Sequence, residues 1–124
     1  MGVPWSSILE PEVTPVGDTE PTFDALYGFS KGRKPRVMVA TEQEMIAAQV
    51  PLERRDYCAH HWINLQRCRV DVMPWVIKCG REKHAWDVCY YEDYVLRMKE
   101  YERERRLLVR KKRKEETEKQ AMAA

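Results

Sequence analysis

The sequence predicts an all-α protein centred on an antiparallel hairpin of two helices crosslinked by two disulfide bonds. Four cysteines form two pairs, each with nine residues between its members, and apolar residues around both pairs recur at helical spacing. A proline-containing stretch of ten residues separates the pairs. We expect an extended segment over residues 1–40, the hairpin over residues 41–94 and a basic helical extension over residues 95–124.

The N-terminal segment, residues 1–40, is expected to be irregular. Prolines at positions 4, 11, 15, 21 and 35 interrupt any helix there. Because such a segment buries no core of its own, we expect it to be disordered or laid across a partner. Its candidate anchors are aromatic side chains: Trp5, Phe23, Tyr27 and Phe29.

The first helical signal is the sequence Thr41-Glu42-Gln43-Glu44. It has the form of a capping box, in which the Thr41 hydroxyl caps the helix and the Glu44 carboxylate accepts a hydrogen bond from the Thr41 amide. Residues 45–48 suit a helix. Pro51 then either breaks or kinks that helix, or opens the next one at its first position.

Two amphipathic stretches predict the helices of the hairpin. From about residue 52 to residue 70, one stripe of a helix with about 100° per residue holds Cys58, His61, Trp62, Leu65 and Cys68. After a short turn at residues 71–73, Pro74 is suited to the first position of a second helix. Its stripe holds Trp75, Val76, Cys79, Trp86, Cys89 and Tyr90. No proline or glycine follows Gly80, so we expect this helix to continue past Arg110.

Helix geometry selects one of the three ways to pair four cysteines. Residues ten apart on one helix lie about 15 Å apart, whereas a disulfide needs Cα atoms within roughly 7 Å. Bonds within each C-x9-C pair are thereby excluded. Pairing Cys58 with Cys79 and Cys68 with Cys89 requires parallel helices, and the ten intervening residues cannot carry the chain back a full helix length. The nested pairs Cys58–Cys89 and Cys68–Cys79 remain.

The disulfides also indicate a compartment, because they form in oxidising environments. Residues 1–30 have neither the basic start nor the apolar run of a secretory signal. They carry five acids and no Lys or Arg, the reverse of an Arg-rich matrix transit peptide. No run of about 18 apolar residues could span a bilayer. We therefore expect the mitochondrial intermembrane space.

Charge is divided between the two ends of the chain. The acidic N-terminal segment contrasts with residues 97–119, which hold eleven bases against six acids, including five consecutive bases at residues 110–114. This polarity suggests that the two ends touch different neighbours. A nuclear signal is disfavoured by the disulfides. The basic run is better interpreted as a solvated helix end, or as one resting on acidic partners or anionic lipid headgroups.

No catalytic or cofactor site is predicted. A zinc site that uses the cysteines with His60, His61 or His84 is disfavoured, because structural zinc takes ligands about two to four residues apart. We expect His60 and His61 to be packed or solvated. The sequence shows no nucleophile–base set or glycine-rich phosphate loop, and the hairpin is too small for a pocket. We therefore expect no flavin, iron–sulfur cluster, quinone, metal, nucleic acid or small-molecule substrate.

The first six residues, Met-Gly-Val-Pro-Trp-Ser, match the pattern for N-myristoylation. Removal of Met1 would expose Gly2 as the acylated residue. A single myristoyl chain holds a protein to a membrane only weakly, so a second contact would be needed. The alternative is an ordinary, unmodified N-terminus.

Three stretches closely resemble the beta-subcomplex subunit 7 family of mitochondrial NADH:ubiquinone oxidoreductase, complex I. They are MVATEQEM at residues 38–45, RDYCAHH at 55–61 and DYVLRMKEYERERRLL at 93–108. The likeness covers about residues 36–114 and includes both C-x9-C pairs and the basic tail. Pro51 and the proline-rich first 35 residues depart from the family pattern.

The resemblance implies a twin C-x9-C (CHCH-domain) accessory subunit without its own active site, on the intermembrane-space face of the membrane arm. It implies contacts with other membrane-arm subunits, a transient contact with the disulfide-relay import oxidoreductase, and a myristoylated Gly2 at the inner-membrane surface. The alternative is a free-standing scaffold or assembly factor of the same hairpin class, such as a cristae-organising protein. Those resemble a long coiled coil that ends in the hairpin, whereas this hairpin is central. A thiol oxidoreductase would need an exposed C-x-x-C or C-P-C pair.

Overall fold

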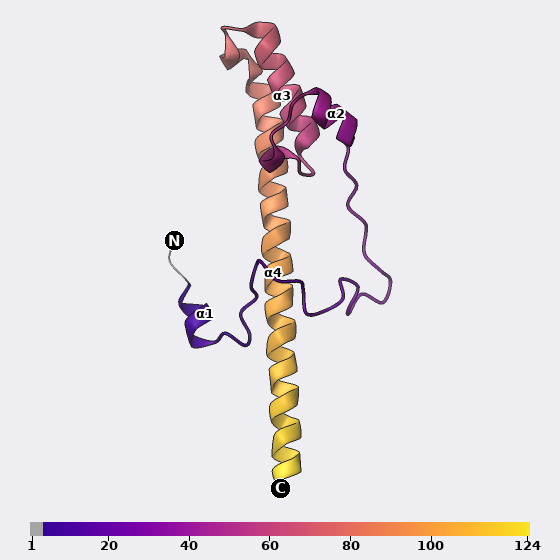
Figure 1. Ribbon diagram of the computed structural model, residues 1–124, viewed down its shortest axis with the longest axis vertical. Coiled ribbons are helices and arrows are strands. Elements are labelled where there is room, and N and C mark those ends of the chain that lie inside the picture. The colour runs from indigo at the N-terminus through magenta and orange to yellow at the C-terminus, as the bar shows by residue number, and fades with distance from the viewer. Residues whose placement is uncertain (1–3) are drawn as a thin grey trace. The chain divides into compact units, whose positions relative to one another are not determined.

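The computed structural model describes residues 4–124, and these residues are helical or irregular, with no strand among them (Figure 1). The α-helices are α1 (Trp5–Leu9), α2 (Glu42–Ala47), α3 (Ala59–Val72) and α4 (Gly80–Ala123). Two short 3-10 helices, η1 (Leu52–Arg54) and η2 (Val76–Cys79), precede α3 and α4. The predicted all-α class is confirmed.

Contacts within the chain divide it into two compact units. The hairpin unit, Lys34–Leu96, holds α2, α3 and the start of α4. The terminal unit consists of Met1–Arg33 and Arg97–Ala124, so it joins the N-terminal segment to the later part of α4. Helix α4 therefore contributes residues to both units.

The start of α2 is capped as predicted. The Thr41 hydroxyl accepts a hydrogen bond from the Glu44 amide, and the Glu44 carboxylate accepts one from the Thr41 amide, both at 3.2 Å. These reciprocal bonds satisfy two amides that a helix start leaves without backbone partners. The capping box is confirmed.

Helix α2 ends before Pro51. Gln49 adopts a left-handed φ of 52°, its amide donates to the Ile46 carbonyl, and the Val50 amide donates to the Met45 carbonyl, both at 3.0 Å. This is the Schellman pattern that terminates a helix. Pro51 is extended (φ −59°, ψ 148°) and leads into η1. The helix is thus broken before Pro51 and not kinked by it, and Pro51 is the N-cap residue of η1 rather than the first residue of a helix.

Helix α3 begins at Ala59 rather than near Leu52, which corrects the predicted start. The Asp56 carboxylate accepts a hydrogen bond from the Cys58 amide at 2.9 Å, and the Asp56 carbonyl accepts one from the Ala59 amide at 3.2 Å. Aspartate side chains that bind the backbone two residues ahead form a turn that competes with helix. Residues 55–58 therefore form the entrance to α3.

The connection between the hairpin helices is longer than predicted. Helix α3 continues to Val72, and α4 starts only at Gly80. Met73 is extended with ψ 137°, as the residue before a proline prefers, so Pro74 lies in the turn and is not the first residue of a helix. Helix α4 then runs to Ala123, which confirms its continuation past Arg110.

The core of the hairpin unit is small. Leu65, Cys58 and Cys79 are its most deeply buried large side chains. A second cluster holds Ala40, Met45, Val50 and Ala59, with Trp62 and Ile63 packed against it. Trp75 and Val76, which the predicted stripe placed inside, are 65% and 50% exposed because they lie in the turn and η2 rather than on α4.

The terminal unit buries little. Helix α1 follows Pro4, whose carbonyl accepts hydrogen bonds from the Ser7 amide at 3.0 Å and the Ser7 hydroxyl at 2.7 Å. Val13 and Thr14 are buried, and the Thr14 hydroxyl donates to the Glu10 carbonyl at 2.8 Å. Across residues 4–124, no helix has the length and apolar character needed to cross a membrane.

Candidate functional site: the crosslinked hairpin and the N-terminal tethers

Both predicted disulfides are present and nested. Cys58 is bonded to Cys89 and Cys68 to Cys79, each with a Cα–Cα distance of 5.9 Å. The outer bond closes a sequence separation of 31 residues and the inner bond one of 11. The nested antiparallel pairing is confirmed, and every cysteine is crosslinked.

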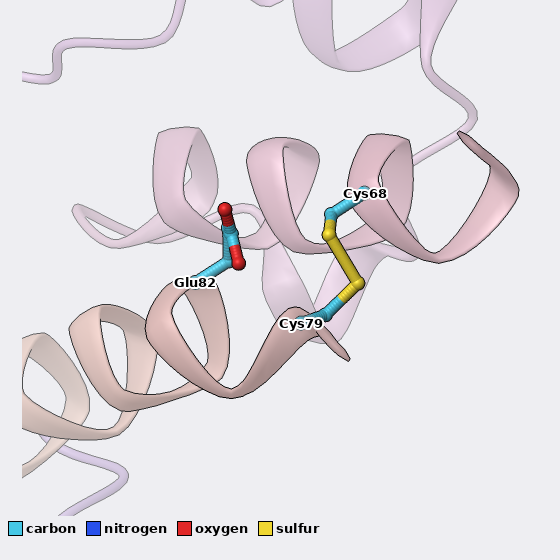
Figure 2. A group of neighbouring side chains, drawn as sticks. All are labelled: Cys68, Cys79 and Glu82. Carbon is cyan, nitrogen blue, oxygen red and sulfur yellow. A yellow bond between two sulfur atoms is a disulfide. The ribbon is translucent and has the colours of Figure 1, made fainter. Parts of the chain in front are cut away.

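The position of each cysteine follows from the ends of the helices. Cys58 is the N-cap residue of α3 and Cys89 lies in α4, so the outer bond joins the open end of the hairpin. Cys68 lies in α3 and Cys79 ends η2, so the inner bond joins α3 to the turn before α4 (Figure 2). In the chain-entropy account, closing such loops stabilises the folded state by about 4 and about 3 kcal/mol respectively, and less than their sum when nested.

Aromatic contacts fill the space between α3 and α4 next to the outer bond. The Trp62 and Trp86 rings lie 5.6 Å apart, and Trp86 lies 5.5 Å from Tyr90. The Arg54 guanidinium lies 5.2 Å from the Trp62 ring and 5.1 Å from the Trp86 ring. Aromatic pairs and cation–π contacts each add stabilisation beyond buried area. Trp62 and Trp86, which belong to the two predicted stripes, are therefore in contact.

A second cation–π contact attaches the start of the hairpin unit. The Arg36 guanidinium lies 3.8 Å from the Tyr57 ring and forms an ion pair of 2.7 Å with Asp93. Asp93 is half-buried and belongs to α4. Arg36 thereby joins the chain before α2 to α4.

Glu82 lies beside the inner disulfide (Figure 2). One carboxylate oxygen of Glu82 and the sulfurs of Cys68 and Cys79 lie within 4.8 Å of one another. The Oε2 atom of Glu82 is buried without a hydrogen-bond partner among the described residues. A metal ion would need the thiolate form of these cysteines, and both sulfurs are instead bonded to each other.

The adjacent histidines are half-buried on α3. Their rings lie 4.0 Å apart, and His60 Nδ1 is buried without a hydrogen-bond partner among residues 4–124. Burial, with a smaller contribution from neighbouring His61, lowers the pKa of His60. The lowered pKa favours the neutral form of His60. The expectation that the two histidines are packed or solvated matches their partial burial.

Within the terminal unit, side chains of α4 hold the N-terminal segment. Arg103 donates to the carbonyls of Asp24 at 3.1 Å and Tyr27 at 2.7 Å, and its guanidinium lies 5.3 Å from the Phe29 ring. The other tethers are the Arg33–Glu100 ion pair, the hydrogen bond from the Thr22 amide to Glu104 at 3.0 Å, and the Glu12–Lys112 ion pair at 3.2 Å. We refer to these contacts as the N-terminal tethers.

The tethers differ from what the charge pattern suggested. Acidic and basic ends were expected to touch different neighbours, but in the terminal unit Glu12 and Lys112 touch each other. Hydrogen bonding to Glu12 raises the pKa of Lys112, and hydrogen bonding to Glu100 raises that of Arg33. In the sequence, the signal for this arrangement is the opposite charge of the two ends. That signal does not indicate which residues pair.

A cleft of about 350 Å³ lies along the N-terminal tethers. Its apolar lining includes Pro15, Phe23 and Leu108, and its polar lining includes Glu100 and Arg103. Both of these charged side chains already bind the N-terminal segment. The cleft is therefore a gap beneath the N-terminal segment. Its charged groups Glu100 and Arg103 are already paired, so they do not form a ligand-binding site.

A pair of arginines on α4 shares one carboxylate. Glu102 accepts hydrogen bonds from Arg105 at 2.7 Å and from Arg106 at 3.0 Å. The bond from Arg105, followed by that from Arg106, lowers the pKa of Glu102 to about 2. Glu102 is thus ionised at any physiological pH.

Gly2, the predicted lipidation site, lies outside the described residues.

Comparison with known proteins identifies the family. A family model described as NADH-ubiquinone oxidoreductase B18 subunit (NDUFB7) matches residues 39–101. The chain is similar to NADH dehydrogenase [ubiquinone] 1 beta subcomplex subunit 7 of Mus musculus, with 51% identity over 110 residues, which covers 89% of this chain and 77% of the relative. The protein of the same name from Caenorhabditis elegans is 48% identical over 122 residues, covering 94% and 99%. The Bos taurus protein is 56% identical over 98 residues, covering 79% and 71%.

The chain belongs to the NADH-ubiquinone oxidoreductase B18 subunit family. It is accordingly a subunit of mitochondrial complex I, and the family resemblance seen in the sequence is confirmed. The B18 match at residues 39–101 contains both disulfides and most of the hairpin unit. The alignment with the nematode B18 relative covers 94% of the chain, so the likeness extends into the terminal unit.

Proposed function

We propose that the chain is a non-catalytic accessory subunit of complex I, which supports the assembly and stability of the complex from the intermembrane-space face of its membrane arm. The observation that carries this proposal is the use of all four cysteines as crosslinks of a helical hairpin. Disulfides persist in oxidising compartments, and the intermembrane space supplies one. Thiols consumed in this way are not available for thiol chemistry, which supports a structural role for the hairpin.

The partners of the proposed subunit are neighbouring membrane-arm subunits. The apolar side chains that remain exposed on the hairpin unit support this, since Trp75 is 65% and Ile77 is 86% exposed at the closed end of the hairpin. Large apolar side chains clustered at one end of a small domain are typical of an interaction surface. We propose that this end packs against another subunit.

Entry into the compartment follows from the same chemistry. We propose that the reduced chain is oxidised by the disulfide-relay import oxidoreductase, with which it forms a transient mixed disulfide. Folding of the hairpin then retains the chain in the intermembrane space. Gly2, by its place in the myristoylation pattern, is proposed to carry an acyl chain into the inner-membrane surface.

The proposal is tested by shortening the chain in cells that lack the endogenous subunit. Deletion of residues 95–124 removes α4 from residue 95 onward, including the residues that hold the N-terminal tethers. We expect less assembled complex I on native gels, while NADH oxidation per assembled particle stays normal. A matched control deletes only residues 120–124, which form none of the tethers. Full assembly with slow turnover would contradict an accessory role.

A further inference from the structure

We propose that three arginines of α4, Arg106, Arg110 and Arg113, bind the phosphate groups of an anionic membrane surface. We name this set the arginine row. It would supply the second contact that a chain held by one acyl group needs, because one myristoyl chain alone gives an association constant of only about 10⁴ M⁻¹. The inference extends the proposed function, since it rests on a subunit that lies against the inner membrane.

The arginine row lies on one face of the helix. Its members are four and three residues apart, a spacing that aligns side chains along a helix. Together with Arg105 and Val109 they surround a single hollow on the surface of α4. Guanidinium groups present planar pairs of donors that match phosphate oxygens. The hollow therefore combines several phosphate-binding donors with one apolar contact.

Neighbouring carboxylates neutralise little of the positive charge of the row. Arg106 shares Glu102 with Arg105, at 3.0 and 2.7 Å. Within residues 4–124, Arg110 and Arg113 form no ion pair. Four guanidinium groups thus surround the hollow against a single carboxylate. The surplus of positive charge favours a polyanionic surface over a neutral one.

The row lies only partly beside the N-terminal segment. Arg110 lines one hollow with Phe23 and Tyr27 and another with the tether residue Arg103. The tether residues Glu100, Glu104 and Lys112 lie on other sides of the helix. No hydrogen bond or ion pair joins the row to the described part of the N-terminal segment. The Arg106 side chain is 76% exposed. The exposed side chains of Arg106 and Arg113 can therefore meet an external surface without displacing the segment.

The acyl signal favours a membrane over an acidic protein as the occupant. The sequence of the chain carries a pattern for N-myristoylation, and an acylated chain that needs a second contact would find it at an anionic leaflet. Each basic side chain close to an anionic leaflet strengthens binding by about fivefold. Three such residues, added to one acyl chain, convert a weak and reversible contact into a stable one.

The test measures co-sedimentation of the oxidised, unacylated full-length chain with vesicles. Phosphatidylcholine vesicles that contain about 30% phosphatidylglycerol carry a strongly negative surface. We expect binding to these vesicles in about 0.1 M salt, loss of binding in about 0.5 M salt, and none to phosphatidylcholine alone. The variant Arg106→Gln, Arg110→Gln, Arg113→Gln should bind about 100-fold more weakly. Millimolar inorganic phosphate should not displace the chain, because isolated ions lack the surface potential of a leaflet.

The matched control changes three exposed basic residues of the hairpin unit, Arg67→Gln, Lys78→Gln and Arg81→Gln. It loses the same net charge and should retain binding within about threefold, and circular dichroism should show both variants to be folded. Equal losses in the two variants, or no binding of the original chain, would overturn the proposal. So would an arginine-row variant that binds vesicles normally yet fails to join complex I, since that identifies an acidic protein as the partner. These outcomes leave the assembly test of residues 95–124 unaffected.

Discussion

The two units of the chain are stabilised by different forces. The hairpin unit has two covalent crosslinks, a buried Leu65 and a cluster of packed tryptophans. Among its described residues the terminal unit buries only Val13 and Thr14, and it is held by ion pairs and hydrogen bonds at the surface of α4. Salt does not screen crosslinks or apolar burial, whereas exposed ion pairs are weak and screened. One unit should therefore respond to reductants and the other to ionic conditions.

The largest expected effect is the loss of the hairpin on reduction. Removing the outer disulfide, which closes a separation of 31 residues, costs about 4 kcal/mol, a large fraction of the stability of a domain this small. Circular dichroism should show clear loss of helix when a thiol reductant is added. A thermal midpoint that is unchanged after complete reduction would show that the crosslinks do not stabilise the hairpin unit.

A smaller but substantial effect is expected from a cavity in the hairpin core. Leu65 is 1% exposed, so Leu65→Ala should lower the free energy of unfolding by about 3 kcal/mol. The control is Ile77→Ala, because Ile77 is 86% exposed and its truncation should change stability by less than about 0.5 kcal/mol. Urea unfolding of the oxidised chain measures both. Similar values for the two variants would place the core elsewhere.

Loss of one tether should affect the terminal unit alone. Arg103→Ala removes two hydrogen bonds to backbone carbonyls and the contact with Phe29. Because these contacts are exposed, we expect a change below about 1 kcal/mol, seen as faster hydrogen exchange at residues 22–33. Hydrogen exchange in α3 should be unchanged. Exchange that increases equally in both regions would show that the units unfold together.

The smallest expected effect comes from acidifying the solution. The folded pKa of Glu102 is about 2, below the usual value near 4.3, so its pairing with Arg105 and Arg106 contributes above the unfolded pKa and is lost as the pH falls through about 2. Nuclear magnetic resonance titration should therefore show the Glu102 carboxylate changing near pH 2. Glu92, exposed on α4, is the control carboxylate. A Glu102 titration near its usual pKa would show that the pairs do not persist in solution.

Features that depend on local spacing were predictable from the sequence. The nine-residue intervals between cysteines exclude all but one antiparallel pairing, and both bonds have that pairing. The capping box is a pattern of four neighbouring residues, and Thr41 and Glu44 form it. In each case, short spacings along the chain limit which atoms can meet.

Boundaries and long-range contacts were not predictable in the same way. The start of α3 was placed too early because the hydrogen bond from the Cys58 amide to the Asp56 side chain has no periodic signal. The second helix was placed too early because Pro74 lies in the turn. The N-terminal tethers join residues 67 to 100 positions apart, from Arg33 and Glu100 to Glu12 and Lys112. Complementary charge permits many registers, so the residue pairs could not be assigned from composition.

The shared helix has a consequence for the order in which the chain acquires its structure. The first turn of a helix is costly to nucleate, whereas each further residue adds a hydrogen bond at little cost. Because the bond to Cys89 fixes α4 near its beginning, we expect the crosslinked hairpin to nucleate the helix, which then extends towards Ala123. The N-terminal segment is synthesised first, yet its docking sites at Glu100, Arg103 and Lys112 exist only once that extension is complete. We therefore expect the tethered part of the N-terminal segment, residues 12–33, to dock last although it is synthesised first.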